Sequence, residues 1–331
     1  MRREKGVMIL TMKKRIVLSL LLVLGLLVVG CSSNQEASKT KTKFLSIATG
    51  GTSGTYYPVG GAIAKVISEN VDNVEASAQS TGASVTNSRL IQKKEVELAI
   101  LQNDIASYAY NAKNDFEGNA VNNMRGIATL YPEIIQIVVR SESGIKTIDD
   151  LKGKKVAVGA PGSGVEANAK QILSTFGLTY DDIDEDFLSF GEAASRLKDR
   201  QIDAAFLTAG VPTAAVMDVA ATQDIKLLNL TVDQINELNS KYPFLTGVEI
   251  PAGTYNGQEQ IVNTVALKAT LVVQEELSED LVYNITKAIF ENRDALVEAH
   301  ARAKDIKAET AQDGMTIPLH PGAQKYFDEL K

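Results

Sequence analysis

The chain has 331 residues, of which 44% are hydrophobic, with a formal net charge of −7, a single cysteine and no tryptophan. The hydrophobic content excludes a disordered chain, and an acidic charge without a basic cluster argues against a nucleic-acid-binding protein. One cysteine excludes a disulfide framework and a cysteine metal site.

The first 30 residues predict a lipoprotein signal peptide. Three basic residues at 13–15 precede an uncharged apolar run from 16 to 29, which ends at Gly30 and Cys31. This pattern is typical of a secretory signal, and the run is shorter than the about 20 residues that a membrane-spanning helix needs. The segment around Cys31 resembles the lipobox of bacterial lipoproteins, whose cysteine receives lipid and becomes the new N-terminus. We therefore expect a signal peptide over 1–30 and lipidation at Cys31.

Residues 31–43 predict a flexible tether, because they are polar and show no apolar period. Signal and tether together place the mature protein outside the cytoplasm, lipid-anchored to the cell membrane on its cell-surface or periplasmic side. The membrane is therefore a predicted partner through the lipid anchor, and nucleic acid is not. Removal of 1–30 also removes six basic residues and one acidic residue, which makes the mature chain more acidic.

Two segments that begin near residues 44 and 154 show the same order of predicted elements. The first runs from "FLSIATGGTSGTYY" to "VELAILQNDIASYAY", and the second from "KKVAVGAPGSGVEAN" to "IDAAFLTAGVPTAAVM". In each segment, a first apolar strand leads into a glycine-rich turn and a helix. A second strand then precedes a helix that contains the triplet Ser-Arg-Leu. A third strand ends in a polar triplet. Continuously apolar strands are typical of parallel sheets covered on both faces. Each copy therefore predicts a βαβαβ unit.

Two such units predict an α/β fold with two lobes, each a mainly parallel sheet flanked by helices, with hinge strands between them. The β-rich runs at 129–140 and 259–273 are candidates for the crossing strands. We expect lobe I to comprise residues 44–136 plus 260–331, and lobe II to comprise 137–259. A single doubly wound sheet is the alternative.

The glycine turns and the polar strand ends are expected at the carboxyl edge of the sheets, where ligands bind in such folds. A glycine turn that opens a helix presents unpaired N–H groups and the positive end of the helix dipole, which suits a carboxylate or phosphate. Gly50 and Gly54 permit close approach of the backbone. The candidate ligand-binding residues are Gly51, Thr52, Thr55, Tyr56, Gly82, Ser84, Asn87, Gln102, Asp104, Tyr131, Gly162, Ser163, Gly164 and Thr208.

These candidates indicate the chemistry of the ligand. The carboxylate of Asp104 beside the amide of Gln102 suits a ligand ammonium, and the backbone N–H groups suit a ligand carboxylate. Together they predict a zwitterion or a small dicarboxylate, with Tyr56 and Tyr131 as walls. The hydroxyl-bearing candidates are alternatively helix caps, and a tyrosine is alternatively part of the core.

The sequence contains no nucleotide-binding or catalytic motif. The glycine loop lacks the lysine of a P-loop and the spacing of the dinucleotide fingerprint, and no G-x-S-x-G elbow occurs. The two histidines, His300 and His320, have neither a cysteine nor a second histidine nearby in the sequence, and we expect His320 to be structural. We therefore expect a binding protein rather than an enzyme, with no cofactor and no metal.

The motifs "TGGTSGTYYPVGGAIA", "TGASVTN", "LAILQNDIA", "LYPE", "VAVGAPGSG", "GTYNGQ" and "HPGA" resemble those of the TAXI family of solute receptors. These receptors serve tripartite ATP-independent (TRAP) transporters, and the resemblance spans residues 44–325. It implies a type II periplasmic-binding-protein fold that closes on its ligand by a hinge. It also implies TRAP permease subunits in the membrane as partners of a receptor that we expect to be a monomer. The implied ligand is a small carboxylate or amino acid such as glutamate, glutamine or 2-oxoglutarate.

Carried onto matching positions, the resemblance implies a ligand that meets Gly51, Thr52, Tyr56, Ser84, Gln102, Asp104, Gly162, Ser163, Gly164 and Thr208. Three alternatives stay open at this point. One is the substrate-binding lipoprotein of an ATP-driven importer for a phosphonate-like solute, which a neighbouring ATPase gene would favour. Another is a surface hydrolase or transferase on a two-lobed scaffold. The last is an adhesin or immunogenic surface protein, which could coexist with transport.

Overall fold

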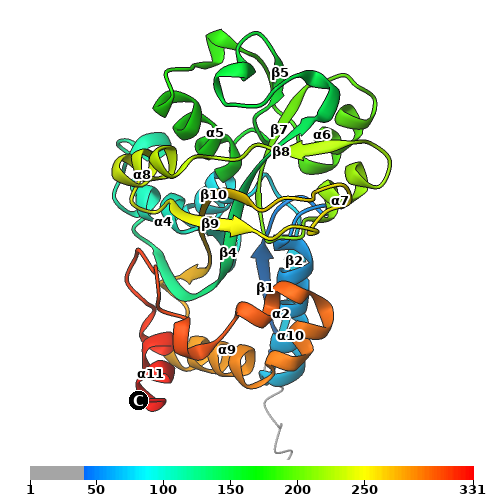
Figure 1. Cartoon of the computed structure of the whole chain (residues 1–331). Helices are drawn as coiled ribbons and strands as arrows, with labels where there is room; N and C mark the ends of the chain where they lie inside the picture. Colours follow the sequence, from blue (N-terminus) through cyan, green and yellow to red (C-terminus); the bar gives the residue numbers. More distant parts are fainter. Residues whose placement is uncertain (1–40) are drawn as a thin grey trace, which may run out of the picture. The chain divides into compact units, whose positions relative to one another are not determined.

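In the computed structural model, which describes residues 41–331, a ten-stranded mixed sheet forms the centre of the fold (Figure 1). The strand order is β2-β1-β3-β10-β4-β7-β5-β6, with β8 paired to β4 and β9 paired to β10. Residues 42–331 belong to one compact unit. The predicted signal peptide, Cys31 and most of the predicted tether lie outside the described residues.

The first copy of the repeat forms one half of this sheet. Its strands and helices alternate as β1 (Lys43–Ala48), α2 (Tyr56–Asn70), β2 (Val74–Gln79), α3 (Ser84–Gln92), β3 (Leu98–Gln102) and α4 (Asn103–Tyr110). Strand β1 pairs in parallel with both β2 and β3, with Lys43 opposite Val74 and Ile47 opposite Leu98. Strand β3 is buried along its whole length, which explains its continuously apolar sequence.

The second copy repeats this arrangement in the other half. Its elements are β5 (Lys155–Ala157), α5 (Gly164–Thr175), β6 (Asp184–Asp186), α6 (Phe190–Lys198), β7 (Ala204–Ala209) and α7 (Ala214–Ala220). Strand β5 pairs in parallel with β6 and β7, so the order β6-β5-β7 repeats the order β2-β1-β3. The predicted βαβαβ unit is thus present twice, and the carboxyl ends of its strands carry the glycine turns.

Two long antiparallel strands join the halves. Strand β4 (Met124–Arg140) pairs with β7, strand β10 (Val262–Gln274) pairs with β3, and the two pair with each other. Their register shifts between Lys268 and Thr270, beside Pro132, which has no N–H to donate to a neighbouring strand. These strands cover most of the two runs that the sequence indicates as crossing strands.

The remaining elements complete each half. Strands β8 (Ile225–Leu227) and β9 (Thr246–Ile250) flank α8 (Val232–Lys241), and the chain ends in α9 (Glu279–Glu291), α10 (Arg293–Ala299) and α11 (Pro321–Glu329). Figure 1 shows α9, α10 and α11, in orange and red, at the end of the unit that holds α2, with α5 and α6 at the opposite end. None of the helices among residues 41–331 combines the length and the apolar character that a membrane crossing requires.

Four hydrophobic clusters fill the spaces between sheet and helices. One joins α2, β1 and β4 to α9 and α11 through residues such as Ile63, Ile285 and Phe327. Two others pack on the sheet around Phe206 and Leu207 of β7, one on each face. The α/β prediction is confirmed. The division into lobes of 44–136 plus 260–331 and 137–259 stays a prediction, because all these residues lie within one compact unit.

Two adjacent glycines of α2 provide a matched test of this packing. A Cβ at Gly60 would lie 2.4 Å from Thr49 Cγ2, and the buried Thr49 side chain is held by its bond to the Gln79 carbonyl. A Cβ at Gly61 meets nothing within 4 Å. We expect Gly60→Ala to lower the free energy of unfolding by about 1 to 3 kcal/mol. Gly61→Ala should raise it by up to about 1 kcal/mol through helix propensity. Urea denaturation followed by circular dichroism measures both, and equal effects would contradict the packing of α2 on β1.

Candidate functional site

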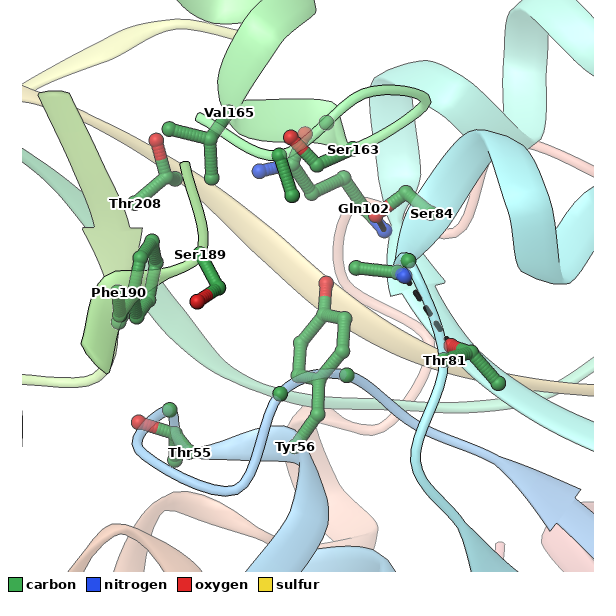
Figure 2. Close-up of a pocket in the computed structure, with 18 of the residues that line it drawn as sticks. Thr55, Tyr56, Thr81, Ser84, Gln102, Ser163, Val165, Ser189, Phe190 and Thr208 are labelled. Carbon is green, nitrogen blue, oxygen red and sulfur yellow. Dashed lines mark hydrogen bonds between the residues drawn. The ribbon is translucent and has the colours of Figure 1, made fainter. Parts of the chain in front are cut away.

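A pocket lies between the two halves at the carboxyl ends of their parallel strands. The empty volume between its walls is about 620 Å³, which includes the part open to solvent. Figure 2 shows side chains from both halves pointing into it, with the Tyr56 hydroxyl near its middle. The lining residues are Gly50, Gly51, Gly54, Thr55, Tyr56, Thr81, Gly82, Ala83, Ser84, Gln102, Glu133, Ala160, Ser163, Gly164, Val165, Ser189, Phe190, Thr208 and Ala209.

Four helices begin at this pocket. Their first residues, which all line it, are Tyr56 of α2, Ser84 of α3, Gly164 of α5 and Phe190 of α6. The first turn of each helix leaves backbone N–H groups without partners inside the helix, and the helix dipole places partial positive charge there. None of the lining residues is a lysine, an arginine or a histidine. The helix starts therefore supply positive potential at this pocket, which suits an anionic group.

Hydrogen bonds to backbone carbonyls shape the glycine loop before α2. The Asn87 side chain donates to the carbonyls of Thr49 and Ile100 at 2.6 and 2.7 Å, and Thr81 donates to the carbonyl of Thr49 at 2.9 Å. Ser80 donates to the Gly50 carbonyl at 3.0 Å. These bonds occupy the carbonyls of Thr49 and Gly50 and tie the loop to the segment that leads into α3.

One acidic side chain lines the pocket. The Tyr56 hydroxyl donates to Glu133 Oε2 at 2.6 Å, and both residues are buried, with 7% and 2% of their surface exposed. Burial raises the pKa of Glu133 to about 8, the hydrogen bond from Tyr56 lowers it, and the negative charge of Asp104 raises it further. Burial likewise raises the pKa of Tyr56 well above its usual value. At neutral pH the pair is therefore mainly uncharged.

A buried polar cluster joins the halves behind the pocket. Asn168 of α5 accepts from Gln102 at 3.1 Å and from Thr208 at 3.1 Å through Oδ1, and it donates to Asp104 Oδ2 at 3.4 Å. Burial raises the pKa of Asp104 to about 6, although hydrogen bonds from its neighbours oppose the shift. Gln102 Oε1 is buried and has no partner within the described chain. The cluster brings side chains of β3, α4, α5 and β7 together around one amide.

Comparison with known proteins gives the family of the chain. A model of the NMT1-like family matches residues 47–330, which is most of the sequence. The chain belongs to the NMT1-like family.

The TAXI prediction was wrong, and with it the prediction of TRAP permease subunits as partners, because the matching family model is the NMT1-like one. The motifs behind that prediction are mostly glycine and hydroxyl turns that open helices or end strands. Such turns follow from the geometry of the fold, so they do not distinguish one class of transporter from another. The expectation of glutamate, glutamine or 2-oxoglutarate as ligand rested on the same resemblance.

Two solved structures with TM-scores above 0.5 support the fold of this NMT1-like chain, and a third, with a lower score, is reported beside them. A protein from Bordetella bronchiseptica RB50 is 18% identical, with 86% of this chain and 88% of that chain covered and a TM-score of 0.52. A putative L-cystine ABC transporter protein from Listeria monocytogenes is 13% identical, with coverages of 81% and 98% and a TM-score of 0.51. The alkanesulfonate-binding protein SsuA from Xanthomonas axonopodis pv. citri, bound to MOPS, is 15% identical, with coverages of 87% and 84% and a TM-score of 0.48. The predicted periplasmic-binding-protein fold is confirmed.

The structure brings most of the predicted site residues of the NMT1-like chain to the pocket. Those that line it are Gly51, Thr55, Tyr56, Gly82, Ser84, Gln102, Ser163, Gly164 and Thr208. Ser163 is also the N-cap of α5, where its hydroxyl accepts from the Glu166 N–H at 3.2 Å. Contact of these residues with a ligand stays a prediction.

Five predicted residues lie elsewhere: Thr52, Asn87, Asp104, Tyr131 and Gly162. Thr52 is exposed, and Asn87 is bonded to the glycine loop. Asp104 belongs to the buried cluster, and Tyr131 lines a separate hollow with Lys268. The Gly162 carbonyl accepts from the Thr86 N–H of the other half at 3.1 Å.

Eight lining residues escaped the sequence analysis: Thr81, Ala83, Glu133, Ala160, Val165, Ser189, Phe190 and Ala209. Ser189 and Phe190 occupy in the second copy the place of Ala83 and Ser84 in the first, at the start of the helix after the second strand. Alignment of the two copies would have found them. The signal for Glu133 was an acid inside an otherwise apolar strand.

The raised pKa of Glu133 predicts a pH-dependent stability. The folded state binds this proton more tightly than the unfolded chain, so Glu133 lowers the free energy of unfolding as pH rises from 5 to 8. We expect the free energy of unfolding of Glu133→Gln to rise relative to that of wild type by up to about 1.4 kcal/mol per pH unit over this range. Other groups also make the free energy of unfolding depend on pH: Asp104 lowers it with rising pH, at lower pH than Glu133, and the histidines with lowered pKa raise it. Because both chains contain these groups, the difference between the chains isolates Glu133. Urea unfolding at each pH is the measurement, and parallel profiles would show that Glu133 is ionised in the folded state.

Proposed function

We propose that the chain is the extracytoplasmic solute-binding protein of an ATP-driven importer and captures a small solute with a sulfonate, phosphonate or carboxylate head. The observation that supports this most directly is the convergence of four helix N-termini on a pocket without a basic side chain. Such a pocket holds an anionic head by backbone N–H groups. The partners proposed are a membrane permease and its ATPase, and a neighbouring ATPase gene would support them.

Contacts between the halves fit capture by closure. The Thr86 N–H donates to the Gly162 carbonyl, and Gln102 donates to Asn168, so each half supplies a donor or an acceptor to the other. A solute between the halves adds contacts that exist only when they meet, and it thereby favours the closed arrangement. A monomer anchored through lipidated Cys31 fits this role.

An enzymatic role has no observation in its favour. The pocket hydroxyls of Ser84, Ser163 and Ser189 have no histidine among the other lining residues. His320 is the N-cap of α11, where its Nδ1 accepts from the Gly322 N–H at 3.2 Å. We therefore propose binding and release of the solute without chemical change.

Isothermal calorimetry on the purified full-length protein tests the proposal. The panel contains small sulfonates, phosphonates and carboxylates, each with a neutral alcohol of the same size as its control. We expect at least one acid to bind with a dissociation constant in the micromolar range or below, and its alcohol not to bind. A panel in which no acid binds would reject the proposed function.

Gly164→Ala tests whether the start of α5 belongs to the site. A Cβ at Gly164 would lie 1.9 Å from Gln102 Oε1, so either the amide or the helix start has to move. We expect at least about tenfold weaker binding of the acid found in the panel, which is about 1.4 kcal/mol. Gly61→Ala is the control, because its Cβ meets open space on α2. Equal affinity in the two variants would place the bound acid away from α5.

A further inference from the structure

We infer that Glu133 selects solutes that carry an ammonium group as well as an anionic head, so that the solute of this pocket is a zwitterion. The inference rests on the proposed function and adds the second charge of the solute. It assigns to Glu133 the recognition of that charge, a role that the sequence alone suggested for Asp104.

The position of Glu133 places an acid where the solute lies. Its side chain lines the pocket and accepts from the Tyr56 hydroxyl, which points into the middle of the cavity (Figure 2). Asp104 does not line the pocket and is engaged by Asn168 and by the Ile105 N–H. Of the two buried acids, only Glu133 is therefore available to a bound solute.

Two buried side chains of this pocket offer acceptor positions without donors. An ionised carboxylate offers about four acceptor positions, and among the described residues only Tyr56 donates to Glu133. Gln102 lines the same pocket with 2% of its surface exposed, and its buried Oε1 has no donor in the described chain. Buried acceptors without donors are unfavourable. An anionic head brings no donor for them, whereas an ammonium brings three.

No neighbouring group neutralises an ionised Glu133. The titratable groups that face it are Tyr56 from α2, Tyr131 from β4 and Asp104 from α4, and none of them is cationic. An isolated buried carboxylate is strongly unfavourable, so the empty pocket holds Glu133 protonated. A ligand ammonium favours the ionised form of Glu133, because the carboxylate pairs with the ammonium. The carboxyl proton is released to solvent. One proton is released and no other bond changes.

Packing alone does not require an acid at this place. The neighbours of Glu133 on β4 are apolar, and the strand is almost entirely buried. A glutamine would accept the Tyr56 hydrogen bond equally well and would avoid the cost of a buried charge. A carboxyl group at this position is favourable only when a cationic group of the solute binds to it.

The experiment uses two pairs of probes that differ only in an amino group: 2-aminoethanesulfonate against ethanesulfonate, and L-glutamate against glutarate. Calorimetry on full-length wild type at pH 8 should give at least tenfold tighter binding of the amino member of whichever pair binds. Between pH 8 and pH 6 its affinity should fall about tenfold per pH unit, because Glu133 has to release its proton first. The partner without the amino group should not show this fall.

Glu133→Gln is the decisive variant. It keeps an acceptor for Tyr56 and removes the charge, so the two members of a pair should bind within about threefold of each other, with no dependence on pH between 6 and 8. Glu97→Gln is the matched control, because Glu97 is a partly buried acid outside the pocket that accepts the Ser46 N–H at 2.7 Å. It should retain the preference and the pH dependence of wild type.

The outcomes separate the inference from the proposed function. Equal or tighter binding of the member without the amino group by wild type would overturn the inference and leave an anion-binding receptor in place. If Glu133→Gln still preferred the amino member of a pair, the inference would also be overturned, since another group would then bind the ammonium. Failure of both pairs, together with failure of the wider panel of acids, would reject the proposed function and the inference with it.

Discussion

The antiparallel pairing of β4 with β10 is the constraint on which the rest of the structure depends. Strand β4 also pairs with β7 of one half, and β10 also pairs with β3 of the other, both in antiparallel fashion. A single sheet therefore runs through both βαβαβ units. The pairing fixes the carboxyl ends of β1 and β3 opposite those of β5 and β7. The four helices that follow glycine and serine turns therefore begin at one pocket, although α2 and α6 start more than a hundred residues apart in the sequence.

The same geometry accounts for the electrostatics of the site. Backbone N–H groups from four helix starts supply the positive potential, and glycines let the chain come close enough to use it. The one acid on the pocket wall, Glu133, belongs to β4, and it is therefore carried by the strand that joins the halves. The buried contacts of Asn168 with Gln102 and Thr208 close the rear of the pocket. The proposed anion binding, discrimination and closure thus depend on one arrangement of strands.

Much of the fold could be predicted from the sequence, because β1, β3, β5 and β7 are short and mainly apolar and the turns after β1 and β5 carry glycine. The limits of the prediction lie in the polar residues. Asn87 is of a residue type that often binds ligands, yet its amide donates to the carbonyls of Thr49, just after β1, and Ile100 of β3. Asp104 lies in the first turn of α4 and Glu133 within β4, and only the packing of the two halves decides which of these acids faces the cavity. The family was also beyond reach, because the turns that suggested TAXI receptors are required by the fold itself.

The proposed recognition of an anionic head by main-chain atoms has a consequence for the evolution of this chain. A single substitution to any residue but proline can remove a side chain, but it leaves the peptide N–H groups at the start of a helix in place. Selectivity is therefore free to change through the wall residues, such as Val165, Phe190 and Glu133, while the anchor for the acid persists. Gene duplication followed by a few replacements at these walls would yield binding proteins for different acids. Each of them would retain the backbone N–H groups that bind the acid.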